Sequence, residues 1–162
     1  MDYLEYRTVF EIRILLFMLH KLMKRDTEKR LQESGASITV LQYGVMKVLV
    51  HNAVTLSALA HKMLVEPATL VPVIDALERK EYIKRTPDRM DRRKNYLTIT
   101  DNGRTMLKNI PIVDSDDAFT SVVQRLGTQK QKDLLSLLRQ IINGITSNTK
   151  MTDEITEMTN KE

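Results

Sequence analysis

The chain has 162 residues, of which 42% are hydrophobic and 28% charged, a balance typical of one folded globular domain. It contains no cysteine, which excludes a disulfide framework, a cysteine-ligated zinc site and a thiol redox sensor. The most apolar run, residues 14–19, is too short to span a bilayer, and the N-terminus lacks the basic segment of a signal peptide. These features predict a cytoplasmic protein.

Helical periodicity dominates the first half of the chain. Residues 2–33 predict a long helix, ended by Ser34 and Gly35, whose apolar stripe is wider than one small domain needs. That width favours a partner helix. The stripe contains Val9, Ile12, Leu15, Leu16, Leu19, Leu22 and Met23. Three further helices are predicted at residues 39–51, 56–64 and 67–80, with Thr55 capping the second and Pro72 bending the third.

The second half begins with two predicted strands, residues 82–86 and 95–100. In the second strand, Leu97 and Ile99 alternate with Tyr96 and Thr98, which indicates one buried face. A helix is expected to start at Thr100, to be interrupted at Pro111 and to resume near Asp116. Residues 128–131 have the spacing of a capping box that opens a last helix. Its apolar stripe is Leu134, Leu138, Ile141 and Ile145. For the polar tail after Ser147, a disordered end and a short helix both stay open.

The net charge of +4 is unevenly distributed along the chain. Residues 38–110 hold 12 Lys and Arg against 7 Asp and Glu, whereas the remaining residues hold 13 against 14. A basic excess of this kind is expected where a protein contacts phosphates, although a solvated basic face would give the same count. We therefore expect one chain, 1–162, with a DNA-reading lobe at 38–110 (the reader lobe). Helices in 1–34 and 111–148 would associate with a second copy, and 149–162 would form a tail.

Three stretches carry a more specific pattern. They are the helix pair around Thr55–Ala60 and Ala68–Lys80, the segment from Tyr82 into the loop Asp88–Arg93, and Leu97–Gly103. Their order and spacing resemble the MarR family of bacterial and archaeal transcription regulators, continuously from about Leu41 to Leu107. The resemblance implies a mainly α fold, a winged helix-turn-helix with a two-stranded β wing. It also implies a homodimer formed through the helices of both termini.

The second helix of the pair departs from the family pattern. Family members often direct polar or basic residues from it into the DNA groove, but here Pro67, Ala68, Val71 and Pro72 occupy the matching positions. Some branches, including peroxide sensors, have a comparable Thr-x-x-Pro, but those sensors use an N-terminal cysteine that this chain lacks. Thr69 could contact a base or phosphate, or bond its own backbone, and Ala68 could touch a thymine methyl. Because this helix offers so few polar groups to the bases, recognition of DNA shape is expected to matter more than usual.

The basic loop between the strands is the main candidate for minor-groove contact. The resemblance identifies Arg93 as the wing arginine and Asp91 as the acid that pairs with it. A narrow minor groove attracts arginine, and a carboxylate can hold the guanidinium in place. The alternative is a solvated charged hairpin. At the start of the helix pair, Thr55 and Ser57 occupy a helix N-terminus, which suits phosphate binding as well as capping. The complete predicted DNA-binding set is Thr55, Ser57, His61, Pro67, Ala68, Thr69, Pro72, Arg89, Asp91, Arg92, Arg93 and Lys94.

The predicted function is that of a homodimeric repressor of a pseudo-palindromic operator in double-stranded DNA. The alternative is a winged-helix module that binds protein and not DNA, which would have no need for four cations in one loop. A small-molecule effector is a possible partner, with pocket walls at His20, Met23, Tyr43 and Met106, although methionines are most simply core residues. No metal, cofactor or enzyme activity is expected, because the histidines lack ligand spacing and no nucleophile has an adjacent base.

Overall fold

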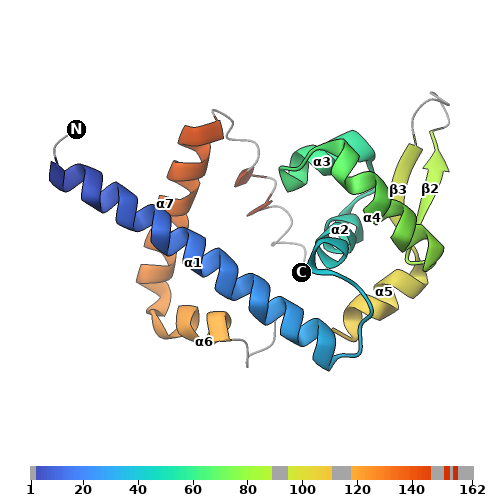
Figure 1. Ribbon diagram of the computed structural model, residues 1–162, viewed down its shortest axis with the longest axis horizontal. Helices are drawn as coiled ribbons and strands as arrows, with labels where there is room; N and C mark the ends of the chain where they lie inside the picture. Colours follow the sequence, from blue (N-terminus) through green and yellow to red (C-terminus); the bar gives the residue numbers. More distant parts are fainter. Residues whose placement is uncertain (1–2, 89–94, 111–117, 147–151, 154, 157–162) are drawn as a thin grey trace.

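The computed structural model describes residues 3–88, 95–110, 118–146, 152–153 and 155–156. Helices and a small sheet make up these parts (Figure 1). The elements are α1 (Tyr3–Glu33), α2 (Val40–His51), β1 (Val54–Thr55), α3 (Leu56–Met63), α4 (Pro67–Arg79), β2 (Ile83–Pro87), β3 (Asn95–Ile99), α5 (Asp101–Lys108), α6 (Ala118–Arg125) and α7 (Gly127–Thr146). The mainly α architecture with a β hairpin confirms the predicted fold class.

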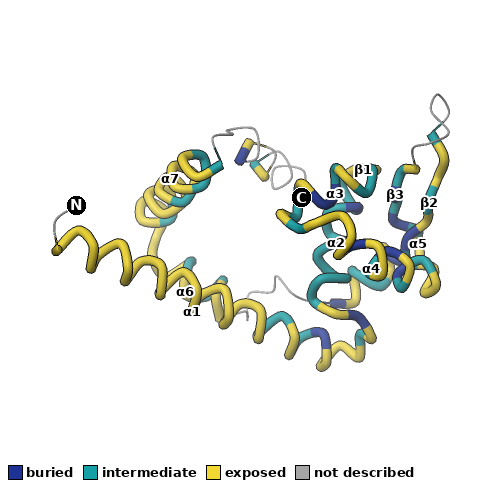
Figure 2. Tube along the Cα trace, turned by 45° about the horizontal axis from the view of Figure 1, so that its top comes forward, coloured by how far each residue is buried: buried dark blue, intermediate teal, exposed yellow. Residues whose placement is uncertain are grey.

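The reader lobe comprises α2 to α5 and the sheet, whereas α1, α6 and α7 make up the other side of the molecule (Figure 1). We call α1, α6 and α7 the helical layer. All of the buried hydrophobic residues in the described ranges fall between Leu31 and Ile110. Figure 2 shows the same division, with buried segments in the lobe and the adjoining end of α1, and a further one in the short tail segment that contains Thr152. The only core of this chain is therefore the core of the reader lobe, as far as the described residues extend.

The sheet has three antiparallel strands in the order β1-β3-β2, one more than the sequence predicts. Ile83 pairs with Ile99 and Pro87 with Asn95, so β2 and β3 form the expected hairpin. The additional strand β1 is only two residues long, and it pairs Val54 with Leu97. A strand of this length shows no alternation in the sequence, and it forms because β3 offers a free edge.

Local caps fix most helix boundaries. The Thr55 and Thr100 hydroxyls accept hydrogen bonds from the backbone amides of Ala58 and Gly103 and so start α3 and α5. Helix α2 begins with a full capping box that was not predicted, in which Thr39 and Gln42 bond reciprocally. Gly35, with φ of 69°, terminates α1 as predicted.

The capping box predicted at residues 128–131 is wrong. Helix α7 begins earlier, at Gly127, so Thr128 lies inside the first turn. The Gln131 side chain donates instead to the Val123 carbonyl of α6, at 2.9 Å. The described tail residues 152–153 and 155–156 are helical, and the Thr152 hydroxyl donates to Asn143 of α7 at 2.9 Å. The other tail residues lie outside the described ranges.

Candidate nucleic-acid interface

The first helix of the pair, α3, exposes its N-terminal turn. The Thr55 hydroxyl accepts from the Ala58 amide at 3.3 Å and lies 3.2 Å from the Ser57 hydroxyl. Ser57 and His61 are exposed, whereas Leu59 is buried on the opposite side of the helix. The capping prediction is thus confirmed. The positive end of the helix dipole and the two hydroxyls are available to an anion from solvent.

The turn between α3 and α4 sets how the second helix is presented. Leu64 adopts φ of 53°, the left-handed conformation that favours glycine. The Val65 amide bonds the Ala60 carbonyl at 3.1 Å and the Leu64 amide bonds the His61 carbonyl at 3.2 Å, which completes a Schellman motif. Pro67 then opens α4, and the helix continues through Pro72 to Arg79. The bend predicted at Pro72 stays a prediction.

Helix α4 has one buried and one exposed face. Leu70, Ile74 and Leu77 are fully buried in the lobe core. The opposite face is exposed and carries Ala68, Pro72, Asp75 and Arg79, spaced so that they form one stripe along the helix. We call these four residues the α4 stripe. Thr69 lies beside it, exposed, and within the described chain its side chain makes no hydrogen bond to its own backbone.

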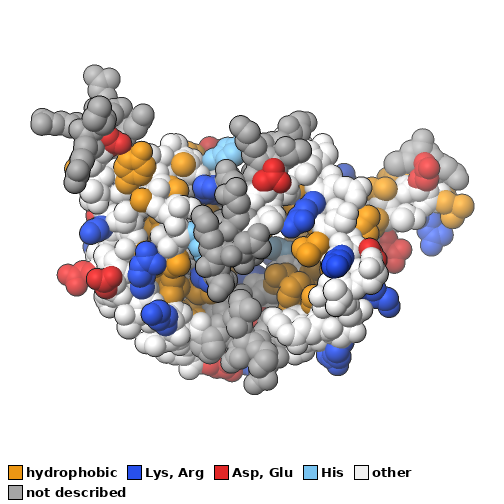
Figure 3. Space-filling model, turned by 180° about the vertical axis from the view of Figure 1, so that it is seen from behind, with side chains coloured by type: hydrophobic (Ala, Val, Ile, Leu, Met, Phe, Trp, Pro, Cys, Tyr) orange, Lys and Arg blue, Asp and Glu red, His pale blue; other side chains and the backbone are white. Residues whose placement is uncertain are grey.

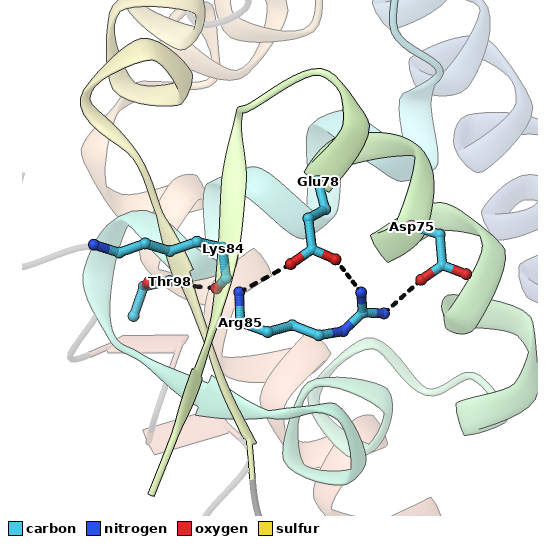
Figure 4. Close-up of polar contacts among 5 residues, drawn as sticks. All are labelled: Asp75, Glu78, Lys84, Arg85 and Thr98. Atoms are coloured by element: carbon cyan, nitrogen blue, oxygen red, sulfur yellow. Dashed lines mark hydrogen bonds and ion pairs between the residues drawn. The ribbon is translucent and has the colours of Figure 1, made fainter.

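An ion-pair cluster links α4 to the hairpin. Arg85 of β2 donates from Nη2 to Asp75 Oδ1 at 2.6 Å and from Nη1 to Glu78 Oε2, and its backbone amide donates to Glu78 Oε1 at 3.3 Å. Figure 4 shows the guanidinium between the two carboxylates. The hydrogen bond to Asp75 and the charge of Glu78 raise the pKa of Arg85, against the effect of burial. Sequence reasoning missed this cluster, because contacts across 7 and 10 residues follow no local spacing rule.

The strands of the hairpin flank the basic loop. β2 ends at Pro87 and β3 begins at Asn95, so the loop connects two strands beside α4. Arg89, Asp91, Arg92, Arg93 and Lys94 lie outside the described residues. Their assignment to DNA contact stays a prediction from the sequence.

The four residues predicted to line an effector pocket come from different environments. Tyr43 and Met106 pack against the lobe core, whereas His20 and Met23 are exposed on α1. A hollow of about 430 Å³ lies instead at the end of α1 and the start of α2. Its lining is Arg25, Glu28, Lys29, Leu31, Gln32, Ala36, Ile38, Thr39 and Val40, and it includes none of the four. The effector pocket therefore stays a prediction.

The helical layer leaves its apolar faces uncovered in the single chain. Helices α6 and α7, which the structure describes throughout, contain no buried residue. On α1, the stripe residues Val9, Ile12, Leu16, Leu19 and Met23 are each at least 40% exposed. Seen from behind, hydrophobic side chains lie at the surface of this part of the molecule (Figure 3). No helix in the described ranges combines the length and apolarity needed to cross a membrane.

A helix-turn-helix, an exposed second helix and an adjoining hairpin define a winged helix-turn-helix protein. The sequence model of the MarR family matches residues 43–94. The transcriptional regulator HosA of Escherichia coli O127:H6 is 28% identical over 128 residues, covering 77% of this chain and 92% of HosA. Over these residues the chain is therefore similar to the MarR family of regulators.

Solved structures agree with this assignment. The transcriptional repressor CouR bound to a 23-mer DNA duplex aligns with a TM-score of 0.67 and 25% identity, over 79% of this chain and 89% of CouR. The Staphylococcus aureus MepR–DNA complex aligns with a TM-score of 0.72 and 20% identity, over 82% of this chain and 96% of MepR. At that identity the likeness to MepR concerns the fold alone.

Proposed function

We propose that the protein is a transcriptional regulator that binds double-stranded DNA as a homodimer. The observation that carries the proposal is the α4 stripe, which is exposed beside the hairpin strands in a chain similar to the MarR family. A helix of this kind fits the major groove of B-DNA, and a flanking loop then reaches the neighbouring minor groove. HosA, by its name, is a transcriptional regulator.

The residues divide into positioning and reading contacts. Ser57 and His61 lie at exposed positions on α3, and the half-buried Thr55 caps its N-terminus, so that hydroxyls, amides and an imidazole can bind phosphate oxygens. On α4, Ala68 and Thr69 face the bases, while Pro67 and Pro72 shape the helix surface that meets the groove. In the loop, Arg93 would enter the minor groove with Asp91 holding its guanidinium. The phosphate contacts there would come from Arg89, Arg92 and Lys94.

The exposed apolar faces of the helical layer support dimerisation. The exposed stripe of α1 and the apolar side chains of α7, such as Ile141 and Ile145, would be covered when two copies pack about a two-fold axis. The two α4 helices would then present themselves to successive major grooves on one side of the duplex, roughly 34 Å apart. An operator with two inverted half-sites is the DNA counterpart of that symmetry. Repression would result from occlusion of a promoter, and in a bacterial or archaeal cell such a protein acts in the cytoplasm.

An effector is a further part of the proposal. A solved relative, CouR from Rhodococcus jostii RHA1, has been determined bound to p-coumaroyl-CoA. A ligand between the helical layer and the lobe would regulate only if it bound one spacing of the two lobes better than another. We retain His20, Met23, Tyr43 and Met106 as its walls. Met23→Trp should then abolish induction by a ligand while leaving the dimer folded, and induction that survives would place the pocket elsewhere. The proposal includes no catalytic activity.

The test is selection of duplexes from a random 30-bp library, followed by titration at several salt concentrations. We expect recovery of an inverted-repeat sequence and a linear fall of log K with log[salt], because bound phosphates release counterions. Failure to enrich any duplex would favour the protein-interaction module, as would binding that does not respond to salt.

A further inference from the structure

The α4 stripe is unusual for a surface that approaches phosphates, because it carries no net charge of its own. Asp75 occupies its middle, Arg79 its end, and Glu78 lies one helical step to the side. The side chains of Asp75 and Glu78 are 49% and 38% exposed, so both carboxylates remain within reach of solvent. Anions at this place would repel the DNA backbone unless a cation held them.

Arg85 is that cation, and its geometry leaves little freedom. Its two terminal nitrogens are divided between the two carboxylates, with Nη2 on Asp75 at 2.6 Å and Nη1 on Glu78. The other oxygen of Glu78 accepts from the Arg85 backbone amide at 3.3 Å, which ties Glu78 to the strand as well as to the side chain. A guanidinium engaged by two carboxylates is held in one orientation on α4.

The strand that carries Arg85 fixes the cluster in place. Arg85 pairs with Leu97 of β3, which is buried in the lobe core, so the strand cannot shift without moving the sheet. The neighbouring residue Lys84 is exposed, and its carbonyl accepts from the Thr98 hydroxyl at 3.4 Å. Figure 4 shows the Lys84 side chain extending away from the two carboxylates. Lys84 therefore carries the same charge on the same strand without taking part in the cluster.

We propose that Arg85 is a positioning residue for DNA reading, which holds Asp75 and Glu78 of α4 against β2 and offsets part of their negative charge at the DNA-facing surface. The inference rests on the proposed function and adds a residue that itself makes no DNA contact. Loss of Arg85 releases two carboxylates toward the phosphates, so removing those carboxylates as well should restore binding. A residue that only stabilises the fold, or that contacts a phosphate directly, would not be rescued in this way.

The test measures affinity for one duplex recovered from the random library by the wild-type chain. Arg85→Ala should weaken binding by about 10-fold or more, within the range measured for coupled neighbours. The triple variant Arg85→Ala, Asp75→Asn, Glu78→Gln should bind within about 3-fold of wild type. Lys84→Ala, the matched loss of one positive charge, should cost clearly less than Arg85→Ala. The deficit of Arg85→Ala should also shrink as salt rises, because screening weakens repulsion.

A second variant keeps the test decisive if Arg85→Ala does not fold. Asp75→Asn with Glu78→Gln, made in the presence of Arg85, should bind at least as tightly as wild type, and weaker binding overturns the inference. A triple variant as weak as Arg85→Ala overturns it too, as does an equal loss from Lys84→Ala. If the wild-type chain enriches no duplex, the proposed function fails and the inference with it. If wild type binds and rescue is absent, the inference alone fails.

Discussion

The reader lobe and the helical layer differ in how much of their apolar surface a single chain buries. In the lobe, Val45, Leu59, Leu70 and Ile74 are fully buried within one chain. In the helical layer, long amphipathic helices keep their apolar stripes at the surface, and α6 and α7 bury no residue. Because exposed apolar patches of this extent mark interaction sites, the lobe is complete in one copy and the layer is not. Under the proposed function, the helical layer carries assembly and the reader lobe carries DNA recognition.

The largest expected effect is on the helical layer. Leu19→Glu places a carboxylate in the α1 stripe, where the single chain leaves Leu19 40% exposed. Burying the exposed part of Leu19 in each of two copies is worth roughly 1–2 kcal/mol of association free energy. An unpaired carboxylate buried in its place costs several kcal/mol more. Sedimentation should then show a monomer whose lobe remains folded.

The matched control for that variant is Arg7→Glu, which introduces the same carboxylate on the same helix but on the face opposite the stripe. It should leave the dimer intact. If Leu19→Glu remains dimeric at micromolar concentration, the α1 stripe is not the interface.

In the reader lobe, the largest effect should come from Gly103→Ala. A Cβ at Gly103 would lie 2.2 Å from the Tyr82 carbonyl oxygen and 2.8 Å from Ile99 Cγ1. The backbone must move to accept it, and we expect a loss of about 3 kcal/mol in the free energy of unfolding. Gly144→Ala in α7 is the control, because its Cβ would meet nothing within 4 Å. Urea unfolding of both variants should separate them, and equal stabilities would show that the lobe is less tightly packed than described.

The wing arginine should have an intermediate effect, on affinity and not on stability. Arg93→Ala is expected to cost about 1–3 kcal/mol of specific binding, because a minor-groove arginine is lost. The measurement is a titration of both proteins against the same selected duplex at fixed salt. Equal affinities would remove Arg93 from the interface.

The smallest effect concerns the turn after α4. Glu81 adopts φ of 59° and closes a Schellman motif, in which the Tyr82 amide bonds the Leu77 carbonyl at 3.0 Å. A residue with a Cβ is strained in the left-handed conformation, and glycine would remove that strain. Glycine also loses more conformational entropy on folding, which offsets part of the stabilisation. Glu81→Gly should therefore stabilise the lobe by about 0.5 kcal/mol. Gly35→Ala, at the equivalent position after α1 with φ of 69°, should destabilise. A Glu81→Gly variant that unfolds more easily than wild type would show that the Glu81 side chain makes a stabilising contact.

Much of this fold is encoded in local signals, which is why the sequence predicts it. Thr55 and Thr100 cap their helices through contacts only three residues away, and the α4 periodicity alone identifies Leu70, Ile74 and Leu77 as core. Local signals also mislead where tertiary contacts compete. The capping box expected at Thr128 fails because Gln131 finds the Val123 carbonyl of the preceding helix.

The features that sequence reasoning missed depend on contacts between distant elements. Strand β1 exists only because Val54 meets Leu97, and two residues cannot show a strand period. The Arg85 cluster joins a helix to a strand, and any of several neighbouring cations could have been its donor on sequence alone. The contact between Arg85 and Asp75 depends on the packing of β2 against α4, which the sequence alone does not reveal.

The most direct test of the account is the stoichiometry of the complex with DNA. Sedimentation of the free chain at micromolar concentration, and then of the chain with its selected duplex, measures both assembly and recognition. We predict a free dimer and a complex of two chains on one duplex containing an inverted repeat. A chain that stays monomeric on the duplex would contradict the account. The apolar faces of the helical layer would then remain exposed, and no dimer would hold two α4 helices at a fixed spacing.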